Sequence, residues 1–184
     1  MASGLSLIGY AYSPSDVAEA ISKAKGKESL VIDRAELLVT PPAMYQLTQL
    51  TAIDLSDNQL SKLEGMEAFS RLKALVVSSN ILVSLPTQIC FLQLTRLILD
   101  SNNITALPNE IGGMTSLVEL DLGNNHLSWL PVSFVNLSNL EKLNLRNNTL
   151  YISDSLCGLQ ALKCLHLDSN RLETLCLNDL PKLL

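Results

Sequence analysis

The sequence is poor in aromatic and in charged residues. Aromatic side chains make up 4% and charged side chains 17% of its 184 residues, whereas apolar residues reach 47%. The formal charge is −5 and the pI is about 5.0, which leaves no concentrated basic face for phosphate groups. Nucleic acid is therefore not the partner that we expect. The length suits one domain with a sizeable core.

Long apolar runs and closely spaced cysteines are also missing. No run is long enough to span a bilayer, and residues 1–16 lack the basic segment of a secretory signal. The four cysteines, Cys90, Cys157, Cys164 and Cys176, follow no metal-ligand spacing. These absences predict a reduced, intracellular and cytoplasmic protein that does not insert into membranes.

One pattern, L-x-x-L-x-L-x-x-N-x-L, recurs along most of the chain. A looser copy begins at Lys27, with Ala35 in the place of the asparagine. The clear copies are 22 or 23 residues apart and begin at Leu50, Leu72, Leu94, Leu117, Leu140 and Leu162. A fixed period of this length is the signature of a repeat architecture.

Each position of the pattern has a physical reason. The central L-x-L segment is a short strand, so its leucines point to one side and its x residues to the other. One unit cannot bury its leucines alone, and stacked units form a continuous core beside a parallel sheet. Where the chain turns inward, an asparagine amide can satisfy buried backbone groups. This column is Asn58, Asn80, Asn102, Asn125, Asn148 and Asn170.

The pattern resembles the leucine-rich repeat family over about residues 27 to 184. The resemblance implies an α/β fold, a right-handed solenoid or horseshoe with a parallel sheet on its concave face and loops or 3-10 turns on its convex face. Several units continue with L-P-x-x-[IF]-x-x-L, which suits a short 3-10 turn. Such units resemble intracellular Ras-pathway scaffolds and the repeat domains of Roco GTPases. KLEGMEAFSRL and YISDSLCGLQAL lack the Leu-Pro pair.

The N-terminal residues 1–26 are predicted to contain a capping helix, and residues 27–184 to form the repeat domain of about seven repeats, the last one incomplete. Ser13, Pro14 and Asp16 are signals for a helix start. We expect this helix to cover the leucines of the first repeat. A partner-binding helix is the alternative.

The C-terminal end has no obvious cap. The chain stops at Leu183 and Leu184, where the first leucine of another repeat is due. An uncapped solenoid end exposes core leucines. We expect a fragment of a longer protein with a further C-terminal domain. The alternatives are a partner that covers this end and a last half-repeat that serves as a minimal cap.

Side chains on the concave x positions are the candidate partner-binding residues. Ala52, Ala74, Val76 and Ile98 predict a solvent-exposed apolar patch. An apolar centre with a charged flank is typical of a protein interface, although β-branched residues also favour strands for their own sake. The predicted set is Ala52, Asp54, Ala74, Val76, Arg96, Ile98, Glu119, Asp121, Lys142, Asn144 and His166.

Catalytic and metal-binding constellations are weak. There is no glycine-rich phosphate loop, no H-E-x-x-H and no G-x-S-x-G. Cys164 and His166 share a strand face, but the next residue in the row of His166 is Asn144, and Asp121 lies two repeats away. The two histidines, His126 and His166, have no ligand set around them. We predict no catalytic residue, no metal and no cofactor.

The function that these features favour is protein binding. We predict an intracellular scaffold or adaptor, in signalling, that binds a protein partner on its concave face. One alternative is the recognition arm of a larger signalling enzyme such as a GTPase, kinase, phosphatase or ubiquitin ligase. Another is a structural subunit of a cytoskeletal or ciliary assembly. The fold alone does not choose among them.

Overall fold

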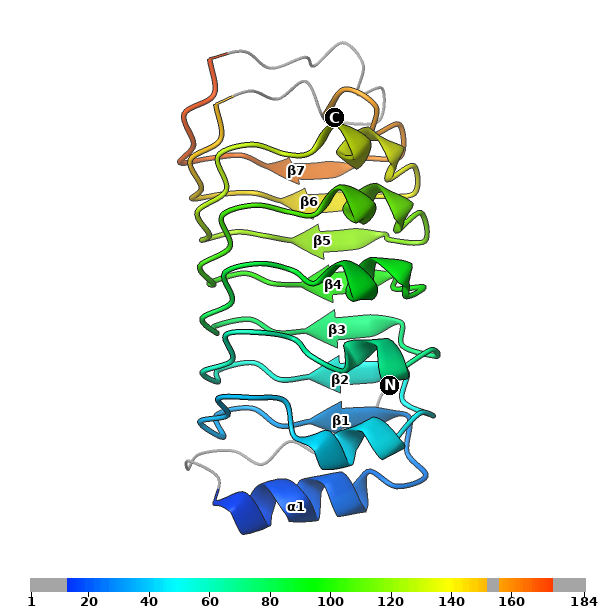
Figure 1. Ribbon diagram of the computed structural model, residues 1–184. Helices are drawn as coiled ribbons and strands as arrows, with labels where there is room; N and C mark the ends of the chain where they lie inside the picture. The colour runs from blue at the N-terminus through cyan, green and yellow to red at the C-terminus, as the bar shows by residue number, and fades with distance from the viewer. Residues whose placement is uncertain (1–12, 152–155, 174–184) are drawn as a thin grey trace.

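The structure, a computed structural model, describes residues 13–151 and 156–173. One α-helix, α1 (Pro14–Lys23), precedes a sheet of short parallel strands that pair in chain order, one strand for each repeat (Figure 1). The strands are β1 (Ser29–Val31), β2 (Ala52–Asp54), β3 (Ala74–Val76), β4 (Arg96–Ile98), β5 (Glu119–Asp121), β6 (Lys142–Asn144) and β7 (Cys164–His166). The predicted open parallel sheet with 3-10 turns and a helical cap is confirmed.

The core lies between the strands and the turns of the opposite side. The middle residue of each strand points inward; Leu97 is 0% exposed and Leu120 is 1% exposed. The next leucine of the pattern, such as Leu99 or Leu122, is also buried. Since side chains alternate along a strand, the first and third strand residues face the other way. The repeat therefore stacks its leucines into one core and leaves one sheet face open.

A proline, in most units that of the Leu-Pro pair, precedes each long turn on the side opposite the open face (Figure 1). The prolines that precede the long turns have φ between −63° and −68°, so they fix the entry of the chain into a 3-10 helix. These five-residue 3-10 helices are η1 (Pro42–Gln46), η3 (Thr87–Phe91), η4 (Asn109–Gly113) and η5 (Val132–Asn136). The unit KLEGMEAFSRL, which lacks the pair, forms only η2 (Met66–Ala68). The other irregular unit overlaps residues 152–155, outside the described residues.

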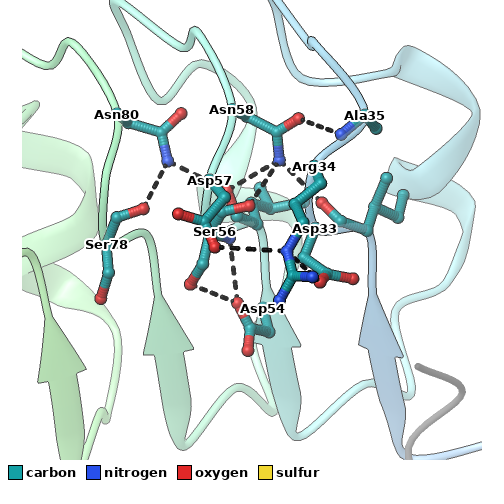
Figure 2. Close-up of polar contacts among 11 residues, drawn as sticks. Asp33, Arg34, Ala35, Asp54, Ser56, Asp57, Asn58, Ser78 and Asn80 are labelled. Atoms are coloured by element: carbon teal, nitrogen blue, oxygen red, sulfur yellow. Dashed lines mark hydrogen bonds and ion pairs between the residues drawn. The ribbon is translucent and has the colours of Figure 1, made fainter. Parts of the chain in front are cut away.

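The asparagine column forms a hydrogen-bond ladder, as predicted. Asn58 shows the pattern: its Oδ1 accepts from the backbone N–H of Ala35 at 3.0 Å (Figure 2). The backbone N–H of Leu37 donates to the same oxygen, also at 3.0 Å. The Nδ2 of Asn58 donates to the carbonyls of Ile32 and Leu55 at 2.8 and 2.9 Å. One amide thus joins two repeats and satisfies backbone groups that water cannot reach.

The residue just before the ladder position adopts a left-handed conformation in every repeat, which the sequence reasoning did not predict. The φ values lie between 51° and 57°, at Arg34, Asp57, Ser79, Ser101, Asn124, Asn147 and Ser169. Side chains such as Asn and Asp tolerate this region better than most residues. The signal in the sequence was therefore the short polar residue that precedes most of the ladder asparagines.

Helix α1 caps the first repeat. Ser13 and Asp16 form the predicted capping box, and hydrogen bonds from the backbone N–H and hydroxyl of Ser13 hold the pKa of Asp16 below its ordinary value of 3.8. Val17, Ile21 and Ala24 are buried within the common core. The helix packs against β1 and η1, so it covers the leucines that the first repeat would otherwise expose.

Candidate functional site

The candidate site is the open face of the sheet, the face predicted to be concave. It carries the first and third residues of each strand, which flank an inward middle residue. The pairing register places these side chains in two rows; for example, Ala52 pairs with Ala74, and Asp54 with Val76. Each predicted partner-binding residue lies at one of these positions, in β2 to β7. The structure therefore brings the predicted set onto one surface, and its role in binding stays a prediction.

The apolar part of this surface differs from the prediction at one residue. Ala52, Ala74 and Val76 are half-buried, as expected for open positions on a sheet. Ile98, expected to face solvent, is only 7% exposed, so this expectation is wrong. It is not part of the hydrophobic core; its neighbours in register are Val76 and Asp121. At a strand spacing of about 5 Å, adjacent side chains on the same face cover it.

Cross-strand contacts organise the charged part of the surface. Arg96 donates from Nε to Glu119 Oε2 at 3.0 Å, and Asn144 donates from Nδ2 to Asp121 Oδ2 at 3.1 Å. Lys142 and His166 are exposed. The arrangement offers one neutralised ion pair between β4 and β5, followed by exposed polar groups on β6 and β7.

Several polar residues of this face also support their own strand ends. Asp54 Oδ1 accepts from the N–H and the hydroxyl of Ser56, at 2.9 and 2.6 Å (Figure 2). Asp121 Oδ1 accepts from the N–H of Gly123 at 2.9 Å. Such local bonds fix the turn that follows each strand. A substitution at Asp54 or Asp121 therefore perturbs the turn as well as the surface.

A shallow recess of about 180 Å³ lies at the C-terminal part of the open face. Within it, Cys164 Sγ lies 3.4 Å from His166 Nε2. His166 has Asn144 as its neighbour in register. The recess thus holds a thiol and an imidazole in contact, without a carboxylate from the next strand to orient the ring. Its polar lining residues are Glu119, Asp121, Lys142, Asn144, Cys164 and His166.

A larger hollow, of about 360 Å³, lies away from the sheet face, beside the loop that follows β1. Leu38 and Val39 line it and are 64% and 69% exposed. Tyr45 closes its floor: the phenol donates to the carbonyl of Glu64 at 2.9 Å. Sequence reasoning missed this hollow, although the apolar run Leu37–Val39 extends beyond the repeat pattern and could have indicated it.

Asp33 stands out at the first repeat because its carboxylate is buried with one oxygen unsatisfied. The residue is 8% exposed, and Oδ1 has no hydrogen-bond partner among the described residues. Oδ2 lies 3.5 Å from Arg34 Nε, and Asp57 Oδ2 lies 3.7 Å from the same nitrogen (Figure 2). The corresponding position in the next two repeats is serine.

We predict that Asp33→Ser raises the free energy of unfolding by about 1 kcal/mol, because it removes a desolvated carboxylate that lacks a full set of partners. Urea denaturation measures the change. Asp57→Ser is the matched control: it loses the same long contact to Arg34, but its side chain is 47% exposed, so we expect a change near zero. A larger loss of stability in Asp33→Ser than in Asp57→Ser would contradict the prediction.

The described residues form neither a metal-binding cluster nor a membrane-spanning helix. No group of three or more His, Cys, Asp or Glu side chains in this part of the chain is placed to hold a metal ion. No helix among the described residues has the length and apolar character needed to cross a membrane.

The central part of the chain matches a known sequence family. A family model described as a leucine-rich repeat matches residues 70–127 and 92–150, the central repeats of the sheet. The chain carries leucine-rich repeats in this central part, and its sheet continues the same repeat on both sides. No curated protein matches it.

Solved structures with this fold extend over most of the leucine-rich repeat chain. A complex of TLR13 with ssRNA13 is 26% identical over 89% of this chain, with a TM-score of 0.77. The ectodomain of the receptor kinase GASSHO1/SCHENGEN3 from Arabidopsis thaliana, in complex with CASPARIAN STRIP INTEGRITY FACTOR 2, is 29% identical over 78%, with a TM-score of 0.69. The Drosophila Toll–Spatzle complex is 29% identical over 77%, with a TM-score of 0.66. The chain spans 25%, 19% and 20% of these chains, respectively.

Proposed function

We propose that this leucine-rich repeat protein binds a protein partner through the open face of its sheet. The observation that carries the proposal is the contrast between the two sides of each strand. The middle residues are leucine or isoleucine in all seven strands. The residues at the open positions vary in size, polarity and charge; examples are Ala52, Asp54 and Arg96. A rigid frame with freely varied side chains on one face suits recognition of another macromolecule.

The chemistry of that face supports a protein rather than a nucleic acid. The half-buried Ala52, Ala74 and Val76 offer an apolar centre, and the ion pair of Arg96 with Glu119 and the exposed Lys142 lie beside it. This combination is usual in protein interfaces. Two of the similar structures are complexes with CASPARIAN STRIP INTEGRITY FACTOR 2 and with Spatzle. The third is bound to ssRNA13, but the formal charge of −5 disfavours phosphate backbones here.

The test is a comparative affinity purification with two variants of the same repeat. Ala74→Arg with Val76→Arg changes β3 on the open face; both positions are half-buried, and Asp54 on the next strand can pair with the new charge. Ile98 is left intact, because a charge there would be desolvated. We expect this variant to lose, by tenfold or more (about 1.4 kcal/mol), the proteins that the wild type retains.

Thr87→Arg with Gln88→Arg is the control, since it adds the same charge at exposed positions of η3 on the other side of the same repeat. This variant should retain the wild-type partners. Circular dichroism checks that both variants fold. Partners that are kept by the β3 variant and lost by the η3 variant would place binding on the opposite face and overturn the proposal.

We also propose that the protein is an intracellular scaffold or adaptor in signalling. Cys90 and Cys164 are free thiols, which supports a reducing compartment. The Leu-Pro units, with their proline-capped 3-10 helices, support the same assignment through their resemblance to Ras-pathway scaffolds. Thiol labelling in intact cells tests it: thiols found free in the cytosolic fraction would support the proposal, and recovery in a secreted fraction would contradict it.

A further inference from the structure

We propose that Cys164 is a modification site that forms mixed disulfides with small disulfide molecules, and that His166 acts as the base. Both residues belong to β7 and lie on the open face, where Sγ is 3.4 Å from Nε2. They line the recess of about 180 Å³. A small reagent can reach the pair, because Cys164 is partly exposed and His166 is exposed.

The contact is the one that thiol activation requires. The thiolate is the nucleophile, and an adjacent imidazole can take the proton from the thiol. The strand fixes the pair, since residues two apart on a strand share a face. Neither side chain has to change its side of the sheet to meet the other. The pair is therefore held ready by the backbone.

One basic and two acidic side chains lie around the pair. Lys142, the register neighbour of Cys164 on β6, lines the recess and adds a positive charge. Each of the two carboxylates that line the recess accepts a hydrogen bond from another side chain. Glu119 accepts from Arg96 at 3.0 Å, and Asp121 Oδ2 accepts from Asn144 at 3.1 Å. Glu119 is thus paired with a cation, whereas Asp121 is held by a neutral amide.

The reaction is thiol–disulfide exchange, and oxidised glutathione is a suitable co-reactant. His166 takes the thiol proton, and the Cys164 sulfur attacks one sulfur of the small disulfide. A new S–S bond joins Cys164 to half of the reagent, and the other half leaves as a thiolate that receives the proton. One disulfide is broken and one is formed, so no further oxidant is needed.

The chain contains its own unreactive comparison in Cys90. Cys90 belongs to η3 and is 2% exposed. Burial, with a contribution from Glu110, raises the pKa of Cys90 to about 12, so the thiolate is scarce at neutral pH. Reaction at Cys164 but not at Cys90 shows that the adduct forms on the folded chain, because the buried thiol becomes accessible only on unfolding.

An adduct on Cys164 would stand among Glu119, Lys142 and Asn144, three of the predicted partner-binding residues. That it would block a partner rests on the proposed function of the open face. The exchange reaction does not, because it is measured without any partner. Fast exchange on a protein that binds nothing would leave this site valid and reject only the proposed function.

The experiment uses the full chain with Cys157→Ser and Cys176→Ser, which leaves Cys90 and Cys164. Oxidised glutathione is added, and intact-mass and peptide mass spectrometry follow the adduct. The rate is compared with that of the same chain in guanidinium, where the strand is lost, with free cysteine as a reference in each solvent. We expect the folded chain to react roughly tenfold faster at Cys164 and to leave Cys90 free.

Three further variants complete the test. His166→Gln should reduce the rate to that of the unfolded chain, and Cys164→Ser should abolish the adduct in the folded state. His126→Gln, an exposed histidine outside the recess, should leave the rate unchanged. A folded-state rate at or below that of the unfolded chain, or an unchanged rate in His166→Gln, would overturn the proposal.

Discussion

Asn102→Ala should lower the free energy of unfolding by about 2–4 kcal/mol. The side chain is 4% exposed. Its Oδ1 accepts from the N–H of Leu82 at 3.0 Å, and its Nδ2 donates to the carbonyls of Val77 and Leu99 at 2.9 and 3.0 Å. Alanine leaves the Leu82 N–H without its partner in a place that water cannot enter, and this penalty outweighs the small change in packing. Urea denaturation, followed by circular dichroism, measures the loss.

The matched control lies one residue further along the chain. Asn103 has the same side chain but is exposed, so Asn103→Ala should change the stability by no more than about 0.5 kcal/mol. The pair of variants separates the position in the ladder from the residue type. Equal effects of the two substitutions would contradict the prediction, because the ladder position of Asn102 would then make no extra contribution to stability.

The ladder illustrates which features the sequence could predict. A residue that recurs in the same place of each repeat answers a demand that every repeat shares, such as the buried turn at Asn58 or Asn125. The inward leucines and the prolines before the 3-10 helices belong to the same class. These features are local to one unit and its neighbour, so the period alone was enough to locate them.

Features that depend on one particular neighbour were not predictable in this way. Ile98 follows the pattern of an open position, but it is 7% exposed between its register neighbours Val76 and Asp121. The spacing of Cys164 and His166 predicts that both lie on one face of the strand. It does not predict that Sγ lies 3.4 Å from Nε2, because that distance depends on the side-chain conformations. The sequence also does not indicate that Asp33 is buried, with Oδ1 lacking a hydrogen-bond partner among the described residues.

The binding partner is harder to predict than the fold. The strand pattern predicts which side chains face outward, and the candidate set lies at the first and third positions of β2 to β7, with Ile98 buried against expectation. What they recognise depends on the partner's chemistry, which the frame does not encode. The similar structures support this view, since one frame is found with ssRNA13 in one case and with Spatzle in another.

Phe134→Ala should lower the free energy of unfolding by about 3–5 kcal/mol. Phe134 is 0% exposed in η5, which packs on η4. The two turns approach closely because of Gly112, where a Cβ atom would clash with the backbone oxygen of Ser133. Rigid backbone on both sides cannot collapse into the cavity, so the full cost of the lost ring is expected.

The control for this substitution is Val132→Ala in the same 3-10 helix, where the side chain is 83% exposed and the change should stay within about 0.5 kcal/mol. Each repeat of a solenoid contacts only its neighbours, so the damage in Phe134→Ala should be uneven. Hydrogen exchange should show amides of β5 and β6 losing more protection than those of β1 and β2. An equal loss along the chain would mean that the repeats unfold as one cooperative unit, and it would argue against the nearest-neighbour description of this protein.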